Sequence, residues 1–133
     1  MTKNLAGKVA LVTGGSRGIG AASARALAEA GPDVAISYVA SADKAESLVR
    51  EMESLGVRAL AFKADQRDLV QVADLIRRVV EQMGQLDILV NNAGVVVSSP
   101  VDEKDADTTA LAELYAINLT SVVAAIRAAA LVM

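Results

Sequence analysis

Short apolar runs alternate along the chain with longer segments in which apolar residues recur every three or four positions. Runs of the first kind predict buried strands, and segments of the second kind predict amphipathic helices. The predicted strands are residues 9–12, 34–38, 58–64 and 86–90, and the predicted helices are residues 18–30, 41–56, 68–84 and 108–133. This alternation predicts an α/β fold with a doubly wound parallel sheet, in the strand order 3-2-1-4 and with helices on both faces.

The turn between the first strand and the first helix is rich in glycine and has the sequence Thr13-Gly14-Gly15-Ser16-Arg17-Gly18-Ile19-Gly20. A strand, a glycine turn and a helix together present free backbone N–H groups and a helix N-terminus, an arrangement that binds phosphate. We expect positive φ angles at Gly14 and Gly18, and close packing of the helix on the strand at Gly20. The spacing Gly-x-x-x-Gly-x-Gly differs from the general dinucleotide fingerprint, so this turn alone is also compatible with an ordinary connection.

Composition narrows the class of protein. Residues 1–133 suit one domain, and 53% of them are hydrophobic while 2% are aromatic, which predicts the aliphatic core of a parallel sheet. Without cysteine or histidine we expect no disulfide, no thiol nucleophile, no histidine base and no metal site. A net charge of -3 without a dense basic run argues against a nucleic acid partner. The apolar runs are shorter than a membrane span and the N-terminus lacks an apolar signal core, which predicts a cytoplasmic protein without membrane contact.

A second motif, Asn91-Asn92-Ala93-Gly94, follows the fourth predicted strand. Alone it would be interpreted as a turn. Together with the glycine turn after the first strand, it gives the chain a resemblance to the short-chain dehydrogenase/reductase family, in particular to bacterial 3-oxoacyl-(acyl carrier protein) reductases and related NADP-dependent reductases. The resemblance covers the whole chain and corresponds to the N-terminal, cofactor-binding portion of that family, a Rossmann-type sheet truncated before the later strands.

The resemblance assigns cofactor contacts to the matching positions. The pyrophosphate and the adjoining ribose would be held by Gly14, Ser16, Arg17, Gly18, Ile19 and Gly20. At the end of the third strand Asp65 would hydrogen-bond the adenine, with Ala64 and Gln66 beside it. Asp65 could instead cap the next helix, but Asp68 is better placed for that role. The cofactor path would be lined, and the sheet braced, by Asn92, Ala93 and Gly94.

Asn118 matches the asparagine of the family's catalytic tetrad, and it is the one catalytic residue that the resemblance implies for this chain. The neighbouring residues make Asn118 unusual, because it interrupts an apolar helical face. The predicted face consists of Leu111, Leu114, Tyr115, Val122, Ile126 and Ala129. We therefore expect a buried amide with hydrogen-bond partners, either as a satisfied core asparagine or in the family's role.

The end of the second strand bears on the choice of cofactor. NAD-dependent enzymes place an acidic residue there to bind the ribose hydroxyls, whereas this chain has Tyr38 followed by Val39, Ala40 and Ser41. No carboxylate would repel a 2′-phosphate, Arg17 supplies a cation, and Ser41 supplies a hydroxyl near a helix N-terminus. Arg17 could equally be a solvated surface charge and Ser41 a helix cap. Because the acid is missing, we predict NADP(H) as the cofactor rather than NAD(H).

The tyrosine and lysine on which the family's proton transfer depends are missing from these 133 residues. Tyr38 is followed four positions later by Ala42, and Tyr115 by Leu119, so neither forms the Tyr-x-x-x-Lys pair. Three hypotheses remain: the cofactor half of an NADP-dependent reductase of a small carbonyl substrate, such as a 3-oxoacyl thioester or a similar ketone; a catalytically incompetent NADP-binding module; or a scaffold that keeps only the fold. The cofactor motifs argue against the scaffold.

The last predicted helix, Thr108 to Met133, has the character of an association surface. From Leu119 to Met133 its one charged residue is Arg127, and a helix that is apolar nearly all round is usually buried against another element. In the family this helix commonly packs in a subunit interface, so the resemblance implies a homo-oligomer. Residues 86–90 would also form an open, apolar sheet edge, which favours pairing with another strand.

Overall fold

The computed structural model describes residues 3–98, 100, 102 and 108–133. Its four strands form one parallel sheet in the order β3-β2-β1-β4, which confirms the predicted order. The strands are β1 (Val9–Val12), β2 (Asp33–Tyr38), β3 (Ala59–Lys63) and β4 (Ile88–Val90). In the register of the sheet, Leu11 of β1 lies between Ala35 of β2 and Leu89 of β4.

The start of β4 differs from the prediction, because β4 begins at Ile88 rather than at Leu86. Asp87 joins β1 before the regular ladder begins: its N–H donates to the Val9 carbonyl over 2.9 Å, and its carboxylate accepts the Val9 N–H over 2.8 Å. The hydrogen bond from the Val9 N–H, and a second one from the Gln85 amide, keep the pKa of Asp87 below its usual value. This side chain therefore anchors the edge strand to the centre of the sheet.

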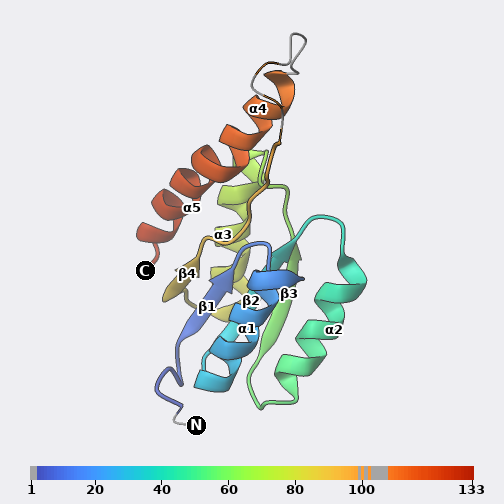
Figure 1. Cartoon of the computed structure of the whole chain (residues 1–133). Coiled ribbons are helices and arrows are strands. Elements are labelled where there is room, and N and C mark those ends of the chain that lie inside the picture. Colours follow the sequence, from blue (N-terminus) through green and yellow to red (C-terminus); the bar gives the residue numbers. More distant parts are fainter. Residues whose placement is uncertain (1–2, 99, 101, 103–107) are drawn as a thin grey trace.

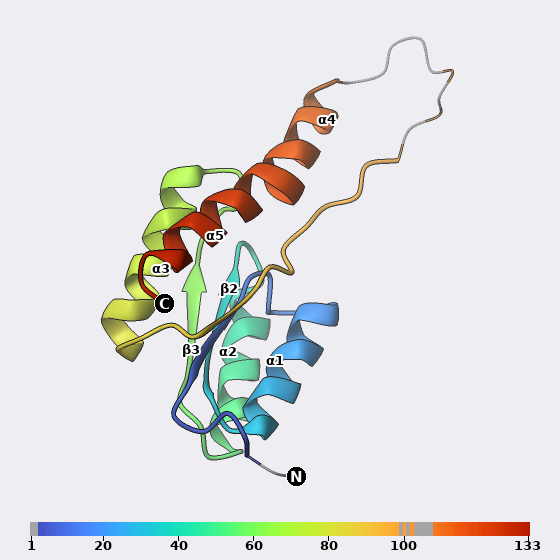
Figure 2. The ribbon, with the colours of Figure 1, turned by 90° about the vertical axis from the view of Figure 1, so that its left-hand side faces the viewer.

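Helices cover both faces of the sheet, as Figures 1 and 2 show. α1 (Gly18–Ala30) and α2 (Ala42–Glu53) lie on one face, and α3 (Leu69–Met83) and α5 (Ser121–Ala130) lie on the other. Two apolar layers result, one around Val12, Ile36 and Met52 and the other around Leu11, Phe62 and Leu75. Because both faces are covered, the strands are apolar on both sides, which explains their continuous apolar sequence.

The segment predicted as one last helix is interrupted. α4 (Thr108–Tyr115) and α5 are joined by a π-helical turn, η1 (Ala116–Thr120). The residues that this segment buries are Ile117, Ser121, Ala125 and Ala129. The predicted apolar face is therefore wrong for Leu111, Tyr115 and Ile126, which are about half-exposed. The π turn adds a residue to one helical turn and so rotates the face.

This segment also corrects the expectation about membrane spans. By length and composition alone, Thr108–Ala130 is long and apolar enough to cross a membrane, since it has 23 residues and an 18-residue window within it has a mean hydropathy of 1.5. The sequence-based expectation that no apolar segment reaches this length is therefore wrong, because the segment combines many alanine, leucine, valine and isoleucine residues with few charged ones. One such helix is weak support for a membrane protein, since helices of soluble proteins also pass this test.

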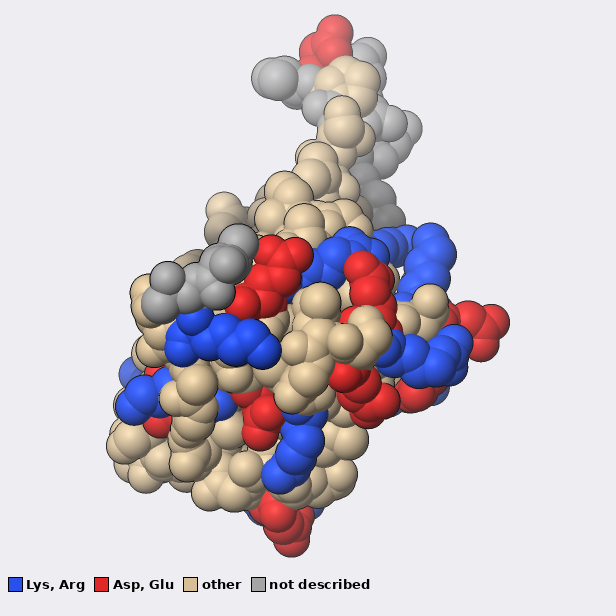
Figure 3. Space-filling model, turned by 90° about the horizontal axis from the view of Figure 1, so that it is seen from below, with Lys and Arg blue, Asp and Glu red and all other residues tan. Residues whose placement is uncertain are grey.

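Charged side chains of both signs are mixed on the face that Figure 3 shows, and the described part of this face has no large patch of one sign. Several charges are paired, as in Arg25–Glu51 at 2.7 Å and Arg77–Glu81 at 2.8 Å. Exposed pairs of this kind contribute little to stability. The predicted loop from Ala93 to about Lys104 lies partly outside the described residues.

Candidate functional site

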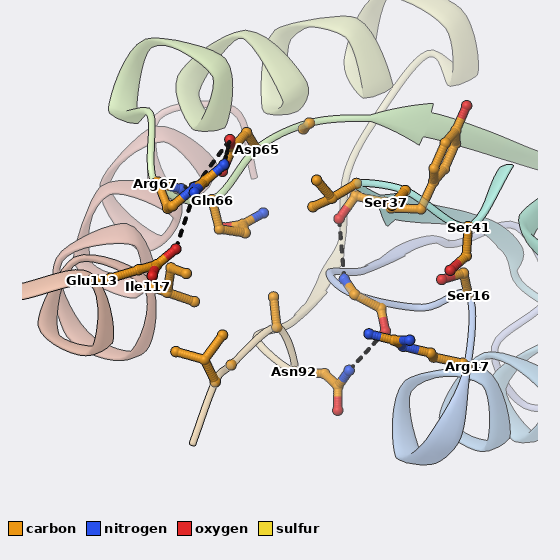
Figure 4. A pocket seen from close by; sticks show the side chains of 18 residues that line it. Ser16, Arg17, Ser37, Ser41, Asp65, Gln66, Arg67, Asn92, Glu113 and Ile117 are labelled. Carbon is orange, nitrogen blue, oxygen red and sulfur yellow. Dashed lines mark hydrogen bonds and ion pairs between the residues drawn. The ribbon is translucent and has the colours of Figure 1, made fainter. Parts of the chain in front are cut away.

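A cleft of about 430 Å³ opens at the carboxyl ends of the four strands (Figure 4). Eleven of the sequence-predicted site residues line it: Gly14, Ser16, Arg17, Tyr38, Ser41, Ala64, Asp65, Gln66, Asn92, Ala93 and Gly94. The sequence did not single out the other lining residues, which are Ser37, Val39, Ala40, Arg67, Val95, Glu113 and Ile117. The cleft lies where the strand order reverses between β1 and β4, the position at which open α/β sheets bind ligands.

The glycine turn has the predicted backbone conformation. Gly14 and Gly18 have positive φ angles of 61° and 57°, which confirms the prediction for both. The turn is held on β2 by Ser37, whose Oγ accepts the Gly14 N–H over 3.2 Å and whose carbonyl accepts the Gly15 N–H over 2.9 Å. The signal for Ser37 in the sequence was a single polar residue within an apolar strand.

The N-terminus of α1 opens beside this turn. Its first intrahelical hydrogen bond runs from the Ala21 N–H to the Arg17 carbonyl over 3.2 Å, so the amides of residues 18–20 precede the helical ladder. Among the predicted residues, Gly18 lines an adjoining hollow, together with Ser16 and Arg17, rather than the main cleft. Ile19 is 80% exposed at the surface.

Gly20 lies buried behind the glycine turn, where a side chain would not fit. A Cβ at this position would lie 2.3 Å from the Gly14 carbonyl oxygen and 2.4 Å from Asn92 Nδ2. The close approach predicted for Gly20 is therefore present, but the nearest neighbours are the turn and Asn92 rather than the first strand. Gly20 thus shapes the cleft without lining it.

Asn92 connects the carboxyl ends of β4 and β1, as the resemblance implied. Its Nδ2 donates to the Thr13 and Gly14 carbonyl oxygens, both over 3.0 Å. Thr13, which is buried, accepts the Asn92 and Ala93 N–H groups on its Oγ1, each over 3.1 Å. Residues almost 80 positions apart therefore form one polar connection beneath the cleft.

Asp65 is already engaged by a neighbouring cation. Its Oδ1 accepts the Arg67 backbone N–H over 2.9 Å and the Arg67 Nε over 3.1 Å, and its Oδ2 accepts Arg67 Nη2 over 2.8 Å. The remaining terminal nitrogen, Nη1, reaches Glu113 of α4 over 3.0 Å. The Arg67 side chain holds the pKa of Asp65 below its usual value, so the carboxylate is charged at neutral pH. The same hydrogen bond from Asp65 raises the pKa of Arg67.

Asn118 is exposed rather than buried, which corrects the prediction from the apolar face. It lies in the π turn η1, and its side chain pairs with the backbone of Val95. Oδ1 accepts the Val95 N–H over 2.8 Å, and Nδ2 donates to the Val95 carbonyl over 2.7 Å. Asn118 does not line the cleft itself, but it holds Val95, which does. The amide therefore has the partners we expected, on a backbone segment rather than in the core.

The end of β2 presents Tyr38 and Ser41 to the cleft. The Ser41 side chain makes no capping hydrogen bond to α2. Beyond Arg17, the adjoining hollow of about 280 Å³ is lined by Arg25 and Lys44. Arg25 is paired with Glu51, whereas Arg17 and Lys44 form no ion pair within the described part of the chain. This side of the cleft therefore carries two cations, Arg17 and Lys44, beside the paired Arg25 and Glu51.

A doubly wound parallel sheet with a glycine turn opening into a helix at the switch point defines a Rossmann-type, nucleotide-binding class of protein. The sequence profile of the short chain dehydrogenase family matches residues 8–133. The chain is 50% identical over 88 residues to the 3-oxoacyl-[acyl-carrier-protein] reductase of Staphylococcus aureus, covering 66% of this chain and 36% of that reductase. The chain therefore belongs to the short-chain dehydrogenase/reductase family, and it corresponds to the N-terminal half of that fold.

Solved structures agree with this assignment. A short-chain dehydrogenase from Burkholderia cenocepacia, solved in complex with NADP, is 47% identical with a TM-score of 0.93, covering 98% of this chain and 52% of that one. A blue fluorescent protein from a metagenomic library, in complex with NADPH, is 42% identical with a TM-score of 0.92, covering 98% of this chain and 53% of that one. The chain thus spans about half the length of these structures.

Proposed function

We propose that residues 1–133 form the cofactor-binding part of a Rossmann domain in an NADP-dependent reductase of the short-chain dehydrogenase/reductase type. The observation that carries this proposal is the convergence of the glycine turn, the open N-terminus of α1 and the Asn92 brace on one cleft at the carboxyl ends of the strands. When bound, NADPH supplies hydride for reduction of a carbonyl to an alcohol. The residues described here would bind and orient it.

The charges of the cleft suggest how the cofactor lies. The diphosphate would meet the amides at the start of α1, near Ser16 and Arg17, because a helix N-terminus attracts anions. The adenine would lie toward Asp65 and Gln66. The nicotinamide would lie toward Ala93 and Gly94, where Asn118 holds the next residue. Asn118 is the residue that we propose as catalytic, by its match to the family.

A preference for NADP(H) over NAD(H) follows from the end of β2. Tyr38 occupies the position at which an acid would bind the ribose hydroxyls. Arg17 and Lys44 offer unpaired cations on the adjoining hollow, where a 2′-phosphate would be attracted. Two of the structural relatives were solved with NADP or NADPH.

Replacing Tyr38 by aspartate is expected to shift the ratio of NADPH to NADH affinity toward NADH by about 10–100-fold, because a carboxylate would face the 2′-phosphate. Titration calorimetry with both cofactors measures this ratio. The neutral variant Tyr38→Asn is the matched control and should leave most of the preference in place. If the unmodified chain binds NADH at least as tightly as NADPH, the argument from Tyr38 is wrong.

A second candidate function is an NADP-binding module without turnover. It is favoured by the absence of a Tyr-x-x-x-Lys pair from these residues, and by the position of Tyr115, which is 55% exposed and does not line the cleft. The two candidates share the cofactor site and differ in whether further residues supply the proton. A small carbonyl compound as substrate, a 3-oxoacyl thioester in particular, and a cytoplasmic location belong to the first candidate.

We also propose that the chain associates through its last helical segment. Leu119, Val123 and Ile126 leave an apolar stripe that is 56%, 40% and 51% exposed, and β4 is an edge strand. Such a surface favours a second copy of this chain or a separate polypeptide carrying the remaining family pattern.

Sedimentation at micromolar concentration is expected to show an oligomer, and Ile126→Lys is expected to weaken it by at least about tenfold, because burial of an isoleucine is worth about 1.5–3 kcal/mol. Val70→Lys, at an exposed position of α3, is the matched control and should change nothing. A compact monomer with a cooperative thermal transition would contradict the proposal.

A further inference from the structure

Arg67 lies between two carboxylates that come from different parts of the chain. Its guanidinium contacts Asp65, at the end of β3, with Nε and Nη2, and it contacts Glu113, on α4, with Nη1 (Figure 4). All three side chains line the same cleft. A guanidinium is planar, so two partners that engage different edges fix its orientation. Neither Arg67 nor Glu113 was assigned a role by the sequence or by the comparisons.

The hydrogen bonds leave part of Asp65 available. Arg67 contributes three donors to this carboxylate: its backbone N–H, Nε and Nη2. Nε is shared between Oδ1 over 3.1 Å and Oδ2 over 3.2 Å, so three donors meet a carboxylate that offers about four acceptor positions, which leaves the capacity for about one further donor. The backbone N–H of Asp65 donates to Gln71 Oε1 over 2.9 Å, which also fixes the main chain at this position. Asp65 is therefore a held acceptor rather than a freely rotating one.

Gln66 supplies a second polar group at this end of the cleft. It is 6% exposed, and its Nε2 has no hydrogen-bond partner among the described residues. A buried donor without a partner is costly, so this atom points to a ligand or a water as its acceptor. The Asp65 carboxylate is an acceptor and Gln66 Nε2 is an unpaired donor. Together they complement the edge of adenine, which carries an amino donor next to a ring-nitrogen acceptor.

The charge at the Asp65 end of the cleft also bears on the orientation of a bound dinucleotide. One cation between two carboxylates leaves a net charge of about one negative unit. Arg17 and Lys44, at the other side of the cleft, are unpaired cations within the described part of the chain. A dinucleotide would therefore be drawn with its phosphates toward Arg17 and its base toward Asp65.

We propose that Arg67 and Glu113 are positioning residues for base recognition: they hold Asp65 so that its carboxylate, which can accept about one further donor, meets the exocyclic amino group of the cofactor's adenine. This proposal rests on the proposed cofactor site and adds to it a specificity device that includes α4. None of the eight residues of α4 is buried, so the link through Glu113 is not a by-product of core packing.

The test compares the affinities of the full chain for NADPH and for its hypoxanthine analogue, in which a carbonyl oxygen replaces the amino group. The unmodified chain should prefer NADPH by about tenfold, because one charge-assisted hydrogen bond is replaced by an oxygen facing a carboxylate. Arg67→Gln should bring this ratio close to that of Asp65→Asn, whose amide can serve either base. Glu113→Gln should give an intermediate ratio. Arg67→Lys should not restore the ratio of the unmodified chain, because an ammonium lacks the planar fork of a guanidinium.

Glu81→Gln is the matched control, since it removes an exposed partner of Arg77 on α3, far from the cleft, and it should leave the ratio unchanged. A structural role for Arg67 would weaken both ligands equally, and an unchanged ratio in Arg67→Gln would overturn the proposal. If Arg67→Gln does not fold, the ratio for Glu113→Gln decides: a value equal to that of the unmodified chain overturns it. A chain that binds neither ligand contradicts the proposed cofactor site itself, whereas tight binding of both ligands by the unmodified chain without discrimination contradicts the proposed base recognition and leaves the cofactor site standing.

Discussion

Replacement of Gly20 by alanine is expected to weaken NADPH binding by more than about tenfold and to lower the free energy of unfolding by about 1–3 kcal/mol. The added Cβ would lie 2.3 Å from the Gly14 carbonyl oxygen and 2.4 Å from Asn92 Nδ2. These two atoms are themselves hydrogen-bonded over 3.0 Å. Relief requires the glycine turn and the end of β4 to move apart, and the amides at the start of α1 would move with the turn. Calorimetric titration and denaturant unfolding measure the two effects.

Gly84→Ala is the matched control for this variant. Gly84 ends α3 with a φ of 89°, and an added Cβ would meet no atom within 4 Å. The substitution therefore adds backbone strain of about 1–2 kcal/mol without a steric clash near the cleft. We expect lower stability and unchanged NADPH affinity. If Gly20→Ala binds NADPH as tightly as the unmodified chain, the close approach of α1 to the turn is not needed for the site.

The 133 residues purified on their own are expected to show no appreciable reduction of acetoacetyl thioesters by NADPH. General acid–base assistance is typically worth about 10²–10⁴-fold in rate, and the Tyr-x-x-x-Lys pair that would supply it is not among these residues. The measurement is the loss of NADPH absorbance in a highly purified sample. A family reductase that contains the pair serves as the positive control.

A robust rate that depends on the protein would contradict this expectation. Tyr115 and Lys104 are then the groups to examine as acids, and Lys104 lies outside the described residues. Tyr115 is exposed on α4, and its replacement by phenylalanine would remove a phenolic proton at little structural cost. Loss of the rate in Tyr115→Phe would identify Tyr115 as the acid and would favour the reductase over the binding module for these residues alone.

Short stretches of sequence predicted those parts of the structure that depend on residues close together along the chain, namely the strands, the glycine conformations and one helix cap. The apolar runs predicted every strand, since periodicity indicates which faces are buried, and the alternation of strands and helices with short connections predicted the order of the sheet. The glycine positions predicted the positive φ angles at Gly14 and Gly18, because glycine adopts that conformation without strain. Asp68 was predicted to cap α3, and its carboxylate accepts the Val70 N–H over 2.9 Å.

Errors arose where packing overrides periodicity. The face of the last helix was predicted from regular spacing, but the π turn at residues 116–120 shifts it, and Ile117 and Ala125 become buried instead of Leu111 and Ile126. The same turn leaves Asn118 exposed, with its amide on Val95. A π turn is stabilised by its tertiary contacts, so the local pattern of apolar residues did not predict it.

The sequence by itself determined the fold class, the strand order, the glycine turn and the family, because each is encoded in residues close together along the chain or in short motifs. Only the tertiary structure decided what surrounds these motifs. Ser37 accepts the Gly14 N–H, Thr13 accepts the Ala93 N–H, and Arg67 reaches Glu113 across 46 positions of sequence. The physical reason is that hydrogen bonds and ion pairs depend on distances in space, and the folding of the sheet, not periodicity along the chain, sets those distances.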